Sequence, residues 1–362
     1  MNAHLFELLR TIRRWAAHYA RISSIWKGLG SPSYSPDPQK CKGKTEILLD
    51  RLYLFFVLKM LPVNYNLFQF DSKKRSEFRE YMDEPLAPFL RYKLYRHLWD
   101  DRYSSLVNDK YVFHCFCSYH GIPVPELYGT LWREKWGETG KTVERIFSAS
   151  PVEKVILKPL RGTQGEGIRF VSRNEIEDEG RFPDKDLRKG DYIIQGIVTQ
   201  HRELVRVNPH SLNTIRLITL LSRDGETIPL AAMLRTSSTT SPIDNFATGG
   251  LVIGIDLETG KLRKYGFQKK EYGTITEKHP LTGLPFEGFE IPRWREVMEI
   301  TTKAQKDFHF IKSIGWDLAV TESGPVVIEG NLDWGTAGIQ AANGGLLTPR
   351  NRRLFEGQGL NF

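Results

Sequence analysis

The sequence has few cysteines and no long apolar run, and each absence excludes a class of protein. Its 362 residues include three cysteines, and Cys115-Phe116-Cys117 places one residue between thiols where zinc ribbons and redox motifs place two. We therefore expect reduced thiols in a cytoplasmic protein. The one dense apolar run, Leu52 to Leu58, stops at Lys59, far short of a membrane span. No stable insertion into a membrane is expected.

A basic run interleaved with stacking aromatic residues is also missing, although the net charge is +8. Such a run is typical of nucleic-acid binding, so we expect no nucleic-acid partner. Nucleotide phosphates would explain the charge as well. The composition, 40% hydrophobic and 26% charged, is that of an ordinary folded protein of two or three structural units. It is compatible with a homo-oligomer.

The first hundred residues predict helices and contain no catalytic motif. Leu5 to Trp26 carries apolar residues at helical spacing with four arginines between them, which predicts a basic amphipathic helix. We expect this helix to pack on the body of the protein, with docking at a membrane surface as the alternative. After a Ser/Pro/Gly-rich link at 28–38, two further helices are expected at about 45–59 and 72–82.

A hairpin near the C-terminus carries the strongest chemical signal. Ile314 to Val320 and Val326 to Asn331 predict two strands, joined by a three-residue turn at Glu322-Ser323-Gly324. That turn length pairs Asp317 with Glu329 across the hairpin. Two carboxylates are therefore expected to face each other between apolar flanks.

Two opposed carboxylates in apolar surroundings need a positive charge between them. Asn331 lies two residues after Glu329, hence on the same face, and adds a neutral oxygen. A small set of oxygen ligands suits Mg²⁺, which keeps several waters and shares its shell with substrate phosphates. We therefore predict a metal site at Asp317, Glu329 and Asn331. The alternative is a half-exposed hairpin whose acids face water.

Lys158 and the glycine-rich segment that follows it predict contacts to phosphates. Lys158 closes an apolar strand, and a buried lysine is costly unless it finds an anion. The segment 161–167 (RGTQGEG) can fold its free amides over phosphates as a flap, although a flexible turn is the alternative. A strand at 168–172 follows this segment, so neither the P-loop nor the dinucleotide fingerprint applies.

A second hairpin predicts a pair of arginines on one face. Strands at 211–222 and 227–238 flank a two-residue turn signal at 223–226, which pairs Arg216 with Met233 and Thr214 with Arg235. Two diagonal arginines repel each other unless an anion lies between them, and a guanidinium suits phosphate or carboxylate oxygens. The alternative is surface solubility. The polar loop that follows, 241–250, can line a small-molecule site.

The order of these features resembles that of the ATP-grasp superfamily. The segments that carry the resemblance are Lys158 with its flap, YIIQGIV at 192–198, LNTIR at 212–216 and EGN at 329–331. The most similar version is the sugar-transfer-associated ATP-grasp branch, which is related to α-L-glutamate ligases and has similar LNTIR, DNF..GG and WD…EGN segments. The resemblance covers about residues 108–340.

The resemblance implies an α+β protein with the ATP-grasp fold, in which two α+β lobes surround a nucleotide cleft, preceded by a mainly helical N-terminal region. We place the helical region at 1–107, the N-terminal lobe at 108–200, the C-terminal lobe at 201–342 and a tail at 343–362. The implied ligands are ATP and one or two Mg²⁺ ions, for which Mn²⁺ can substitute.

The resemblance also assigns roles to residues. Arg216 and Arg235 are the expected catalytic residues, near the transferring phosphoryl group. Asp317, Glu329 and Asn331 hold the metal. The expected substrate-binding residues are Asp244, Asn245, Gly249 and Gly250. The expected ATP contacts are Lys110, Lys158, Gly162, Thr163, Gln164, Gly165 and Gly167, together with an adenine hinge at Gln195, Gly196, Ile197 and Val198.

The implied activity is that of a carboxylate–amine ligase. It would act on small-molecule carboxylate and amine substrates through an acyl phosphate and form an amide or peptide bond, in polysaccharide or cell-surface biosynthesis. The sequence leaves two alternatives open. One is a phosphotransferase in which a hydroxyl attacks ATP, and the other is a non-enzymatic ATP-binding module.

Overall fold

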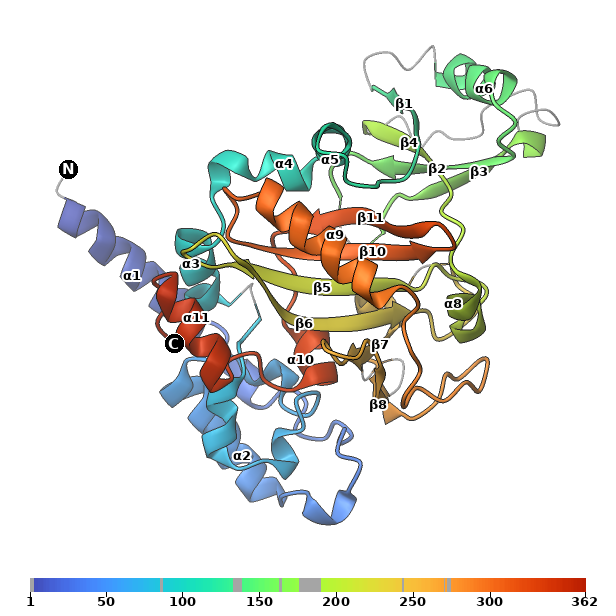
Figure 1. Ribbon diagram of the computed structural model, residues 1–362. Helices are drawn as coiled ribbons and strands as arrows, with labels where there is room; N and C mark the ends of the chain where they lie inside the picture. The colour runs from blue at the N-terminus through green and yellow to red at the C-terminus, as the bar shows by residue number, and fades with distance from the viewer. Residues whose placement is uncertain are drawn as a thin grey trace.

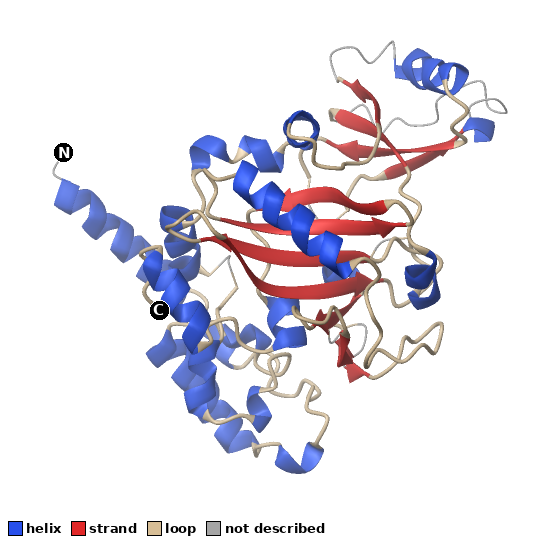
Figure 2. Ribbon diagram, in the orientation of Figure 1, coloured by secondary structure: helices blue, strands red, loops and turns tan. Residues whose placement is uncertain are grey.

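The computed structural model contains two antiparallel sheets, a large one at the centre of the chain and a small one beside it (Figure 1). It describes residues 3–84, 87–132, 139–162, 165–175, 190–242, 244–269, 271 and 275–362. The first third of the described chain is made of helices and loops, and Figure 2 shows most of these to the left of and below the strands of the large sheet. The fold is therefore mixed α+β with a helical N-terminal region, as predicted.

The elements have the following bounds. The α-helices are α1 (Ala3–Tyr19), α2 (Lys44–Tyr53), α3 (Pro88–His97), α4 (Ser105–Asn108), α5 (Lys110–Tyr119), α6 (Thr139–Ala149), α8 (Arg202–Val207), α9 (Trp294–Asp307), α10 (Ala337–Asn343) and α11 (Pro349–Gly357). The strands are β1 (Leu127–Leu131), β2 (Lys154–Pro159), β3 (Arg169–Ser172), β4 (Tyr192–Gly196), β5 (Thr214–Leu221), β6 (Thr227–Thr236), β7 (Leu251–Ile255), β8 (Leu262–Phe267), β9 (Ile275–Thr276), β10 (Ser313–Thr321) and β11 (Gly324–Asn331).

The small sheet has the strand order β1-β4-β2-β3 and a hydrophobic core of its own. Apolar side chains of α6, such as Val143 and Phe147, pack there against Val155, Leu157 and Ile194 of the sheet. Strands β2 and β3 are antiparallel neighbours, as predicted for the strand before the glycine-rich segment and the strand that returns after it.

The large sheet has the order β11-β10-β5-β6-β7-β8-β9, and its two faces differ in chemistry. Trp316 of β10 pairs with Leu217 of β5, and its indole nitrogen donates to Thr219 Oγ1 at 2.9 Å on the face that α9 covers. The next pair along the strands, Asp317 with Arg216, points to the opposite face. One face is therefore apolar core, and the other carries the charged side chains.

In two hairpins of this sheet the turn length differs from the prediction, and a bulge compensates for the difference. The turn of β10 and β11 has two residues between the paired Thr321 and Gly324, one fewer than predicted, and a bulge at Ile328 restores the pairing of Asp317 with Glu329. The turn of β5 and β6 has instead one residue more than predicted, and a bulge between the same strands restores Arg216 opposite Met233 and Thr214 opposite Arg235. The predicted turns were wrong, and so were the predicted pairs nearest the turn of β10 and β11, since Val320 pairs with Pro325 and not with Val326. The pairs Asp317–Glu329, Arg216–Met233 and Thr214–Arg235 were right.

The helical N-terminal region shares one hydrophobic core with the large sheet. Residues 80–83 are tied to α10, because Gln340 accepts from the Met82 amide at 2.7 Å and donates to its carbonyl at 2.8 Å. The helix predictions here need correction. Helix α1 ends at Tyr19, not Trp26, and most of 72–82 is a short 3₁₀ helix, Arg75–Glu80. The proposed domain limits stay predictions.

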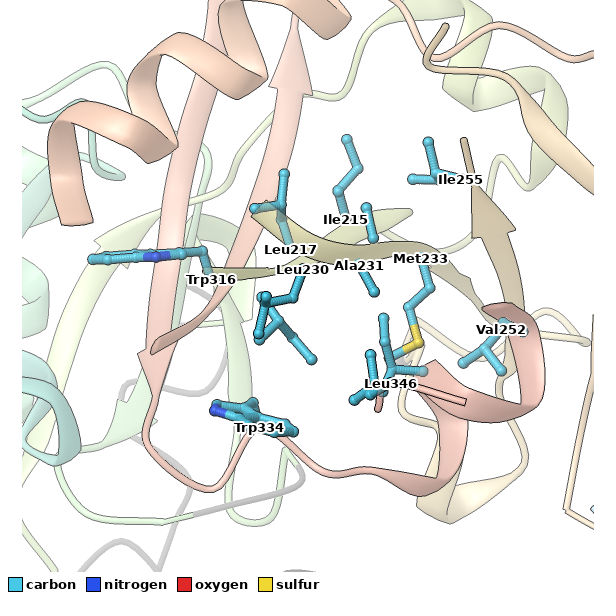
Figure 3. Close-up of a cluster of buried hydrophobic side chains, with 14 of the residues drawn as sticks. Ile215, Leu217, Leu230, Ala231, Met233, Val252, Ile255, Trp316, Trp334 and Leu346 are labelled. Carbon is cyan, nitrogen blue, oxygen red and sulfur yellow. The ribbon is translucent and has the colours of Figure 1, made fainter. Parts of the chain in front are cut away.

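The segment after β11 returns to the charged face of the large sheet. Trp334 and Leu346 from this segment lie among Met233, Leu230 and Val252 of the sheet (Figure 3). Helix α10 packs on β6 and β7. The apolar part of this face is therefore covered, and its charged part stays open. Among the described helices, none has the length and hydropathy needed to cross a membrane.

A glycine in β7 sets the distance of α10 from the sheet, and this gives a stability prediction. A Cβ at Gly254 would clash with the Ala342 carbonyl and lie 2.7 Å from Arg263 Cδ. We expect Gly254→Ala to lower the free energy of unfolding by about 1 to 3 kcal/mol, since overpacking forces neighbours apart. Gly30→Ala is the control, because nothing lies within 4 Å of its added Cβ. Equal urea midpoints for both variants would contradict the prediction.

Candidate active site

A single large cavity brings together the two sheets and the N-terminal region. Its volume is about 1420 Å³, above the range of about 300 to 1,000 Å³ that holds one small ligand. The small sheet contributes Lys158 and the large sheet contributes Arg216 and Asp317 to its wall. Arg51 and Asn66 of the N-terminal region also line it. The cavity has room for a nucleotide together with a second molecule.

Asp317 lies at the centre of the charged face, held by both predicted arginines. It is 1% exposed, and it accepts hydrogen bonds on both oxygens from Arg216, one of them at 2.8 Å. Arg235 reaches the same carboxylate at 3.0 Å between Nη2 and Oδ2. The two arginines therefore do share an anion, as their diagonal placement required. That anion is a side chain of the protein.

The two arginines differ in how many of their donors are engaged. Arg216 uses Nε and Nη2 on Asp317 and donates Nη1 to the Trp334 carbonyl at 3.0 Å, so all three nitrogens have partners. Arg235 donates Nε and Nη2 to Thr214 Oγ1 at 3.0 and 2.9 Å. Its Nη1 makes no hydrogen bond to any part of the chain that the structure describes. Arg235 can therefore bind a further oxygen in the cavity without losing a partner.

The protonation of the acids follows from these contacts. Burial alone would raise the pKa of Asp317, but the charges of Arg216 and Arg235 outweigh it and hold the pKa at about 2. For Glu329, burial and the neighbouring charge of Asp317 raise the pKa, and Lys110 opposes the rise. Burial likewise raises the pKa of Asp244, and Arg235 opposes it. Asp317 is the acid most firmly held as a carboxylate.

The predicted metal ligands converge, although one of them is turned the wrong way. Asp317 and Glu329 are paired across the hairpin, and Asn331 Nδ2 lies 3.5 Å from Asp317 Oδ2 and 3.4 Å from Glu329 Oε1. The amide thus turns its nitrogen, not its oxygen, towards the two acids. Between two anions a donor is the favourable orientation, and a cation there would favour a 180° flip of the amide.

The donor set fits a hard divalent cation that shares its shell with other oxygens. It has two carboxylates and one amide, and no group of three or more His, Cys, Asp or Glu within the described ranges could hold a metal by itself. Asp317 Oδ2 already accepts from both arginines, so Oδ1 and the half-buried Glu329 are the more available oxygens. A cation here would need further ligands from substrate or water.

Two lysines face these acids from the other side of the cavity. Lys158, on β2, is 8% exposed, and burial lowers its pKa to about 8, with Glu329 opposing the shift. Lys110 is the first residue of α5 and donates to the Gly162 carbonyl at 3.1 Å. Both lysines line the cavity and interact electrostatically with Glu329. The predicted phosphate contacts therefore lie beside the predicted metal site.

Part of the glycine-rich loop and of the hinge also reaches the cavity. Gly162, Gly165, Gly196, Ile197 and Val198 line it, whereas Gly167 does not. The Gln195 side chain is buried and lies 3.4 Å from His114 Nδ1 of α5, outside the cavity wall. The structure therefore does not bring these last two predicted contacts, Gly167 and Gln195, to the site. The predicted contacts Thr163 and Gln164 lie outside the described residues.

The predicted substrate loop divides into a chemical part and a structural part. Asp244 and Asn245 line the cavity, and Asp244 accepts a hydrogen bond from Thr214. Gly249 and Gly250 lie outside the wall, and the Gly250 amide closes the loop on the Asn245 carbonyl at 2.9 Å. A Cβ at Gly250 would lie 2.8 Å from the Asn245 carbonyl oxygen. These glycines shape the loop outside the cavity wall, and their part in substrate binding stays a prediction.

The sequence did not indicate the N-terminal wall of the cavity. Arg51 is 1% exposed and donates to the carbonyls of Ser24 at 2.8 Å and Ile25 at 2.6 Å. Lys27 and Asn66 line the same wall. No motif marks these residues, since their position depends on how the N-terminal region packs. Thr214, between Arg235 and Asp244, could have been found from its predicted pairing with Arg235.

The arrangement of two lobes around a charged cavity is that of the ATP-grasp fold. The chain matches the model of the sugar-transfer associated ATP-grasp family over residues 90–355 and belongs to that family. The match begins inside the helical N-terminal region and includes every predicted site residue. No curated protein matches the chain in sequence.

Solved structures with a similar fold include three synthetases or ligases. D-cycloserine synthetase DcsG is 14% identical at a TM-score of 0.45, over 70% of this chain and 71% of that one. The ATP-grasp ligase PsnB, complexed with a phosphomimetic variant of minimal precursor, Mg and ADP, is 18% identical with a TM-score of 0.41, over 71% of this chain and 60% of that one. N5-carboxyaminoimidazole synthetase from Staphylococcus aureus, complexed with ADP, is 12% identical with a TM-score of 0.40, over 66% of this chain and 52% of that one.

The two opposed acids are expected to differ in their effect on stability. Asp317→Asn leaves two buried arginines without their anion and should lower the free energy of unfolding by about 3 to 5 kcal/mol at pH 7. Glu329→Gln removes a repulsion and should leave it unchanged or slightly higher. Denaturant unfolding without nucleotide measures both.

The same measurement has a pH dependence. The pKa of Asp317 in the folded protein is about 2, below its ordinary value of 3.8. Its contribution to the free energy of unfolding is therefore complete above pH 3.8 and is lost as the pH falls towards 2. The difference in free energy of unfolding between the parent and Asp317→Asn should narrow over that range. If Asp317→Asn and Glu329→Gln lowered the free energy of unfolding equally at pH 7, Asp317 would not be the anion that holds the two arginines.

Proposed function

We propose that this protein is an ATP- and Mg²⁺-dependent carboxylate–amine ligase. The observation that carries the proposal is the meeting of four cationic side chains with an oxygen donor set in one cavity. Lys110, Lys158, Arg216 and Arg235 surround Asp317, Glu329 and Asn331. Cations of this kind suit the phosphates of a nucleotide, and the acids and amide suit its metal. Membership of an ATP-grasp family supports the same ligand.

The chemistry has two steps. A carboxylate oxygen of the first substrate attacks the γ-phosphorus of ATP, and the bond from this phosphorus to the oxygen that bridges it to the β-phosphate breaks. ADP departs, and the first substrate becomes an acyl phosphate. The amine nitrogen of the second substrate then attacks the carbonyl carbon, phosphate leaves, and the amine loses a proton to give the amide. The protein would contribute position and charge neutralisation.

The proposal gives the two arginines different roles. Arg235, whose Nη1 is free of partners among the described residues, would donate to the transferring phosphoryl group. Arg216, with all three nitrogens engaged, would hold the Asp317 carboxylate in place. Magnesium, when bound by Asp317, Glu329 and Asn331, would neutralise charge on the phosphates. The cavity's size leaves room for the carboxylate substrate beside ATP.

A hydroxylamine trap tests the function directly. The protein is incubated with ATP, magnesium and hydroxylamine across a panel of carboxylates, since a hydroxamate reports an acyl phosphate. A carboxylate-dependent hydroxamate together with ADP is the expected result. ADP formation with a hydroxyl acceptor but no hydroxamate would indicate a phosphotransferase. Nucleotide binding without any turnover would indicate a binding module.

Glu329→Gln should abolish ATP consumption while the fold is kept. Loss of one charge from the donor set weakens the binding of the metal and of metal-bound ATP. The measurement is ADP release at saturating magnesium, with the denaturant midpoint as the check on folding. Wild-type ATP consumption by a folded Glu329→Gln variant would exclude this metal site.

Arg235→Lys should lose far more in kcat than in ATP affinity. The lysine keeps the charge but not the planar donor set, and loss of one such donor typically costs on the order of 10²-fold in rate. Calorimetry gives the ATP affinity, and single-turnover ADP release gives the rate. Arg263→Lys is the control, since Arg263 does not line the cavity. Weaker ATP binding with an unchanged rate would limit Arg235 to nucleotide binding.

A further inference from the structure

Helix α1 leaves large apolar side chains uncovered. Leu8 is 56% exposed, Leu9 48% and Ile12 53%. Figure 1 shows the helix extending beyond the rest of the chain, so its N-terminal half has few neighbours. An apolar helix face of this kind normally packs on a core. The expectation that α1 packs on the body is met by only part of the helix.

The body contacts one narrow face of α1. Trp15 meets Phe89 of α3 with ring centroids 5.0 Å apart, and His18 stacks on Phe55 at 4.2 Å. Arg14 lies over the ring of Tyr92 at 3.7 Å. Positions 11, 14, 15 and 18 share this face by helical spacing. The remaining circumference of the helix faces away from the body.

The exposed circumference has an apolar side. Leu8, Ile12 and Tyr19 follow helical spacing on it, with Leu9 beside them. Tyr19 continues the surface to the neighbouring Phe56, at a centroid distance of 6.4 Å. We call this set the α1 apolar surface, and its exposed members are Leu8, Leu9, Ile12, Tyr19, Phe56 and Val57.

The other exposed side of α1 is basic. Arg10 and Arg13 share it by helical spacing, Arg21 follows just after the end of α1, and all three are exposed. Residues 3–27 contain five Lys and Arg against a single acid, Glu7. Glu7 accepts a hydrogen bond from Tyr92 at 3.0 Å and pairs with Arg96, both on α3. Its negative charge is therefore directed towards α3 and does not offset the exposed arginines. The outward charge of α1 is positive.

We propose that α1 docks the protein on the surface of an anionic lipid bilayer. The α1 apolar surface would enter the boundary between headgroups and acyl chains, and the arginines beside it would bind lipid phosphates and carboxylates. The helix would lie in the membrane plane and would not cross it. A second copy of this chain fits less well, because pairing two α1 helices would bring their arginines together.

The surface is separate from the cavity. None of its six residues lines the cavity, so the inference does not rest on the proposed ligase activity. Variants of the surface should leave ATP binding in solution unchanged. Failure of membrane binding and failure of nucleotide binding can therefore be told apart.

Vesicle co-sedimentation tests the proposal with the full chain. One vesicle type is phosphatidylcholine alone, and the other is phosphatidylcholine mixed with phosphatidylserine. We expect the parent to bind the second type more tightly and to lose binding as salt is added. Leu8→Gln with Ile12→Gln should weaken binding at least about 10-fold, since both side chains lose their apolar contact. Glutamine keeps the helix propensity.

The charge arm uses Arg10→Gln with Arg13→Gln. Binding to the phosphatidylserine vesicles should weaken about 25-fold, at about fivefold for each charge, with little change in binding to phosphatidylcholine. Leu281→Gln is the control, because Leu281 is 44% exposed on a loop outside α1 and should bind as the parent does. Circular dichroism and the urea midpoint verify folding.

Three outcomes would overturn the proposal. The first is a parent protein that does not bind anionic vesicles. The second is a folded Leu8→Gln, Ile12→Gln variant that binds them as the parent does. The third is self-association of the parent in analytical ultracentrifugation that this double variant abolishes, in the absence of any vesicle binding. That result would assign the α1 apolar surface to a second copy of the chain.

Discussion

A buried carboxylate between two arginines organises the charged face of the large sheet. Asp317 is 1% exposed and takes hydrogen bonds from Arg216 on both oxygens and an ion pair from Arg235. Buried charges are tolerated only where they are paired, and Asp244, 3.7 Å from Arg235 Nε, offsets the one positive charge that Asp317 leaves on the two arginines. Their contact requires β5, β6 and β10 to be in one register. The bulge between β5 and β6 is therefore necessary to this contact, and the bulge at Ile328 of β11 brings Glu329 opposite Asp317.

The cavity is close to charge balance before any ligand enters. Four cations, two from each lobe, face the carboxylates of Asp244, Asp317 and Glu329. When a nucleotide binds with a divalent cation, its phosphates would replace the carboxylates as partners of the lysines and of Arg235, and the metal would replace these cations as the partner of the acids. The orientation of Asn331 fits this account, since its amide nitrogen faces the acids until a cation favours the oxygen. The site would then need little rearrangement of the backbone to bind ATP.

The N-terminal region has two separate tasks in this account. Its inner residues, Arg51 and Asn66 among them, close the cavity on the side away from the small sheet. Its first helix extends outward with an apolar and a basic face. The region shares a hydrophobic core with the large sheet, and α1 packs beside that core through contacts of Trp15 with Phe89 and of His18 with Phe55. The position of the enzyme on a surface and the shape of its second substrate site would thus depend on the same hundred residues.

The sequence by itself determined the strands, their pairs and most of the site. A period of two places Asp317 with Glu329, and Arg216 with Arg235, on a shared face. The predicted turn lengths give the pairs Asp317–Glu329 and Arg216–Met233 only because a bulge in each hairpin offsets an error of one residue in the turn. Tertiary structure decided the rest. The Gln195 side chain turns to His114 and the Gly250 amide closes its own loop, so neither residue lines the cavity, whereas Arg51 reaches it from far along the chain. The anion between the arginines also belongs to this second group. Local pattern shows that an anion is required, but only the packing of three strands shows that Asp317 supplies it.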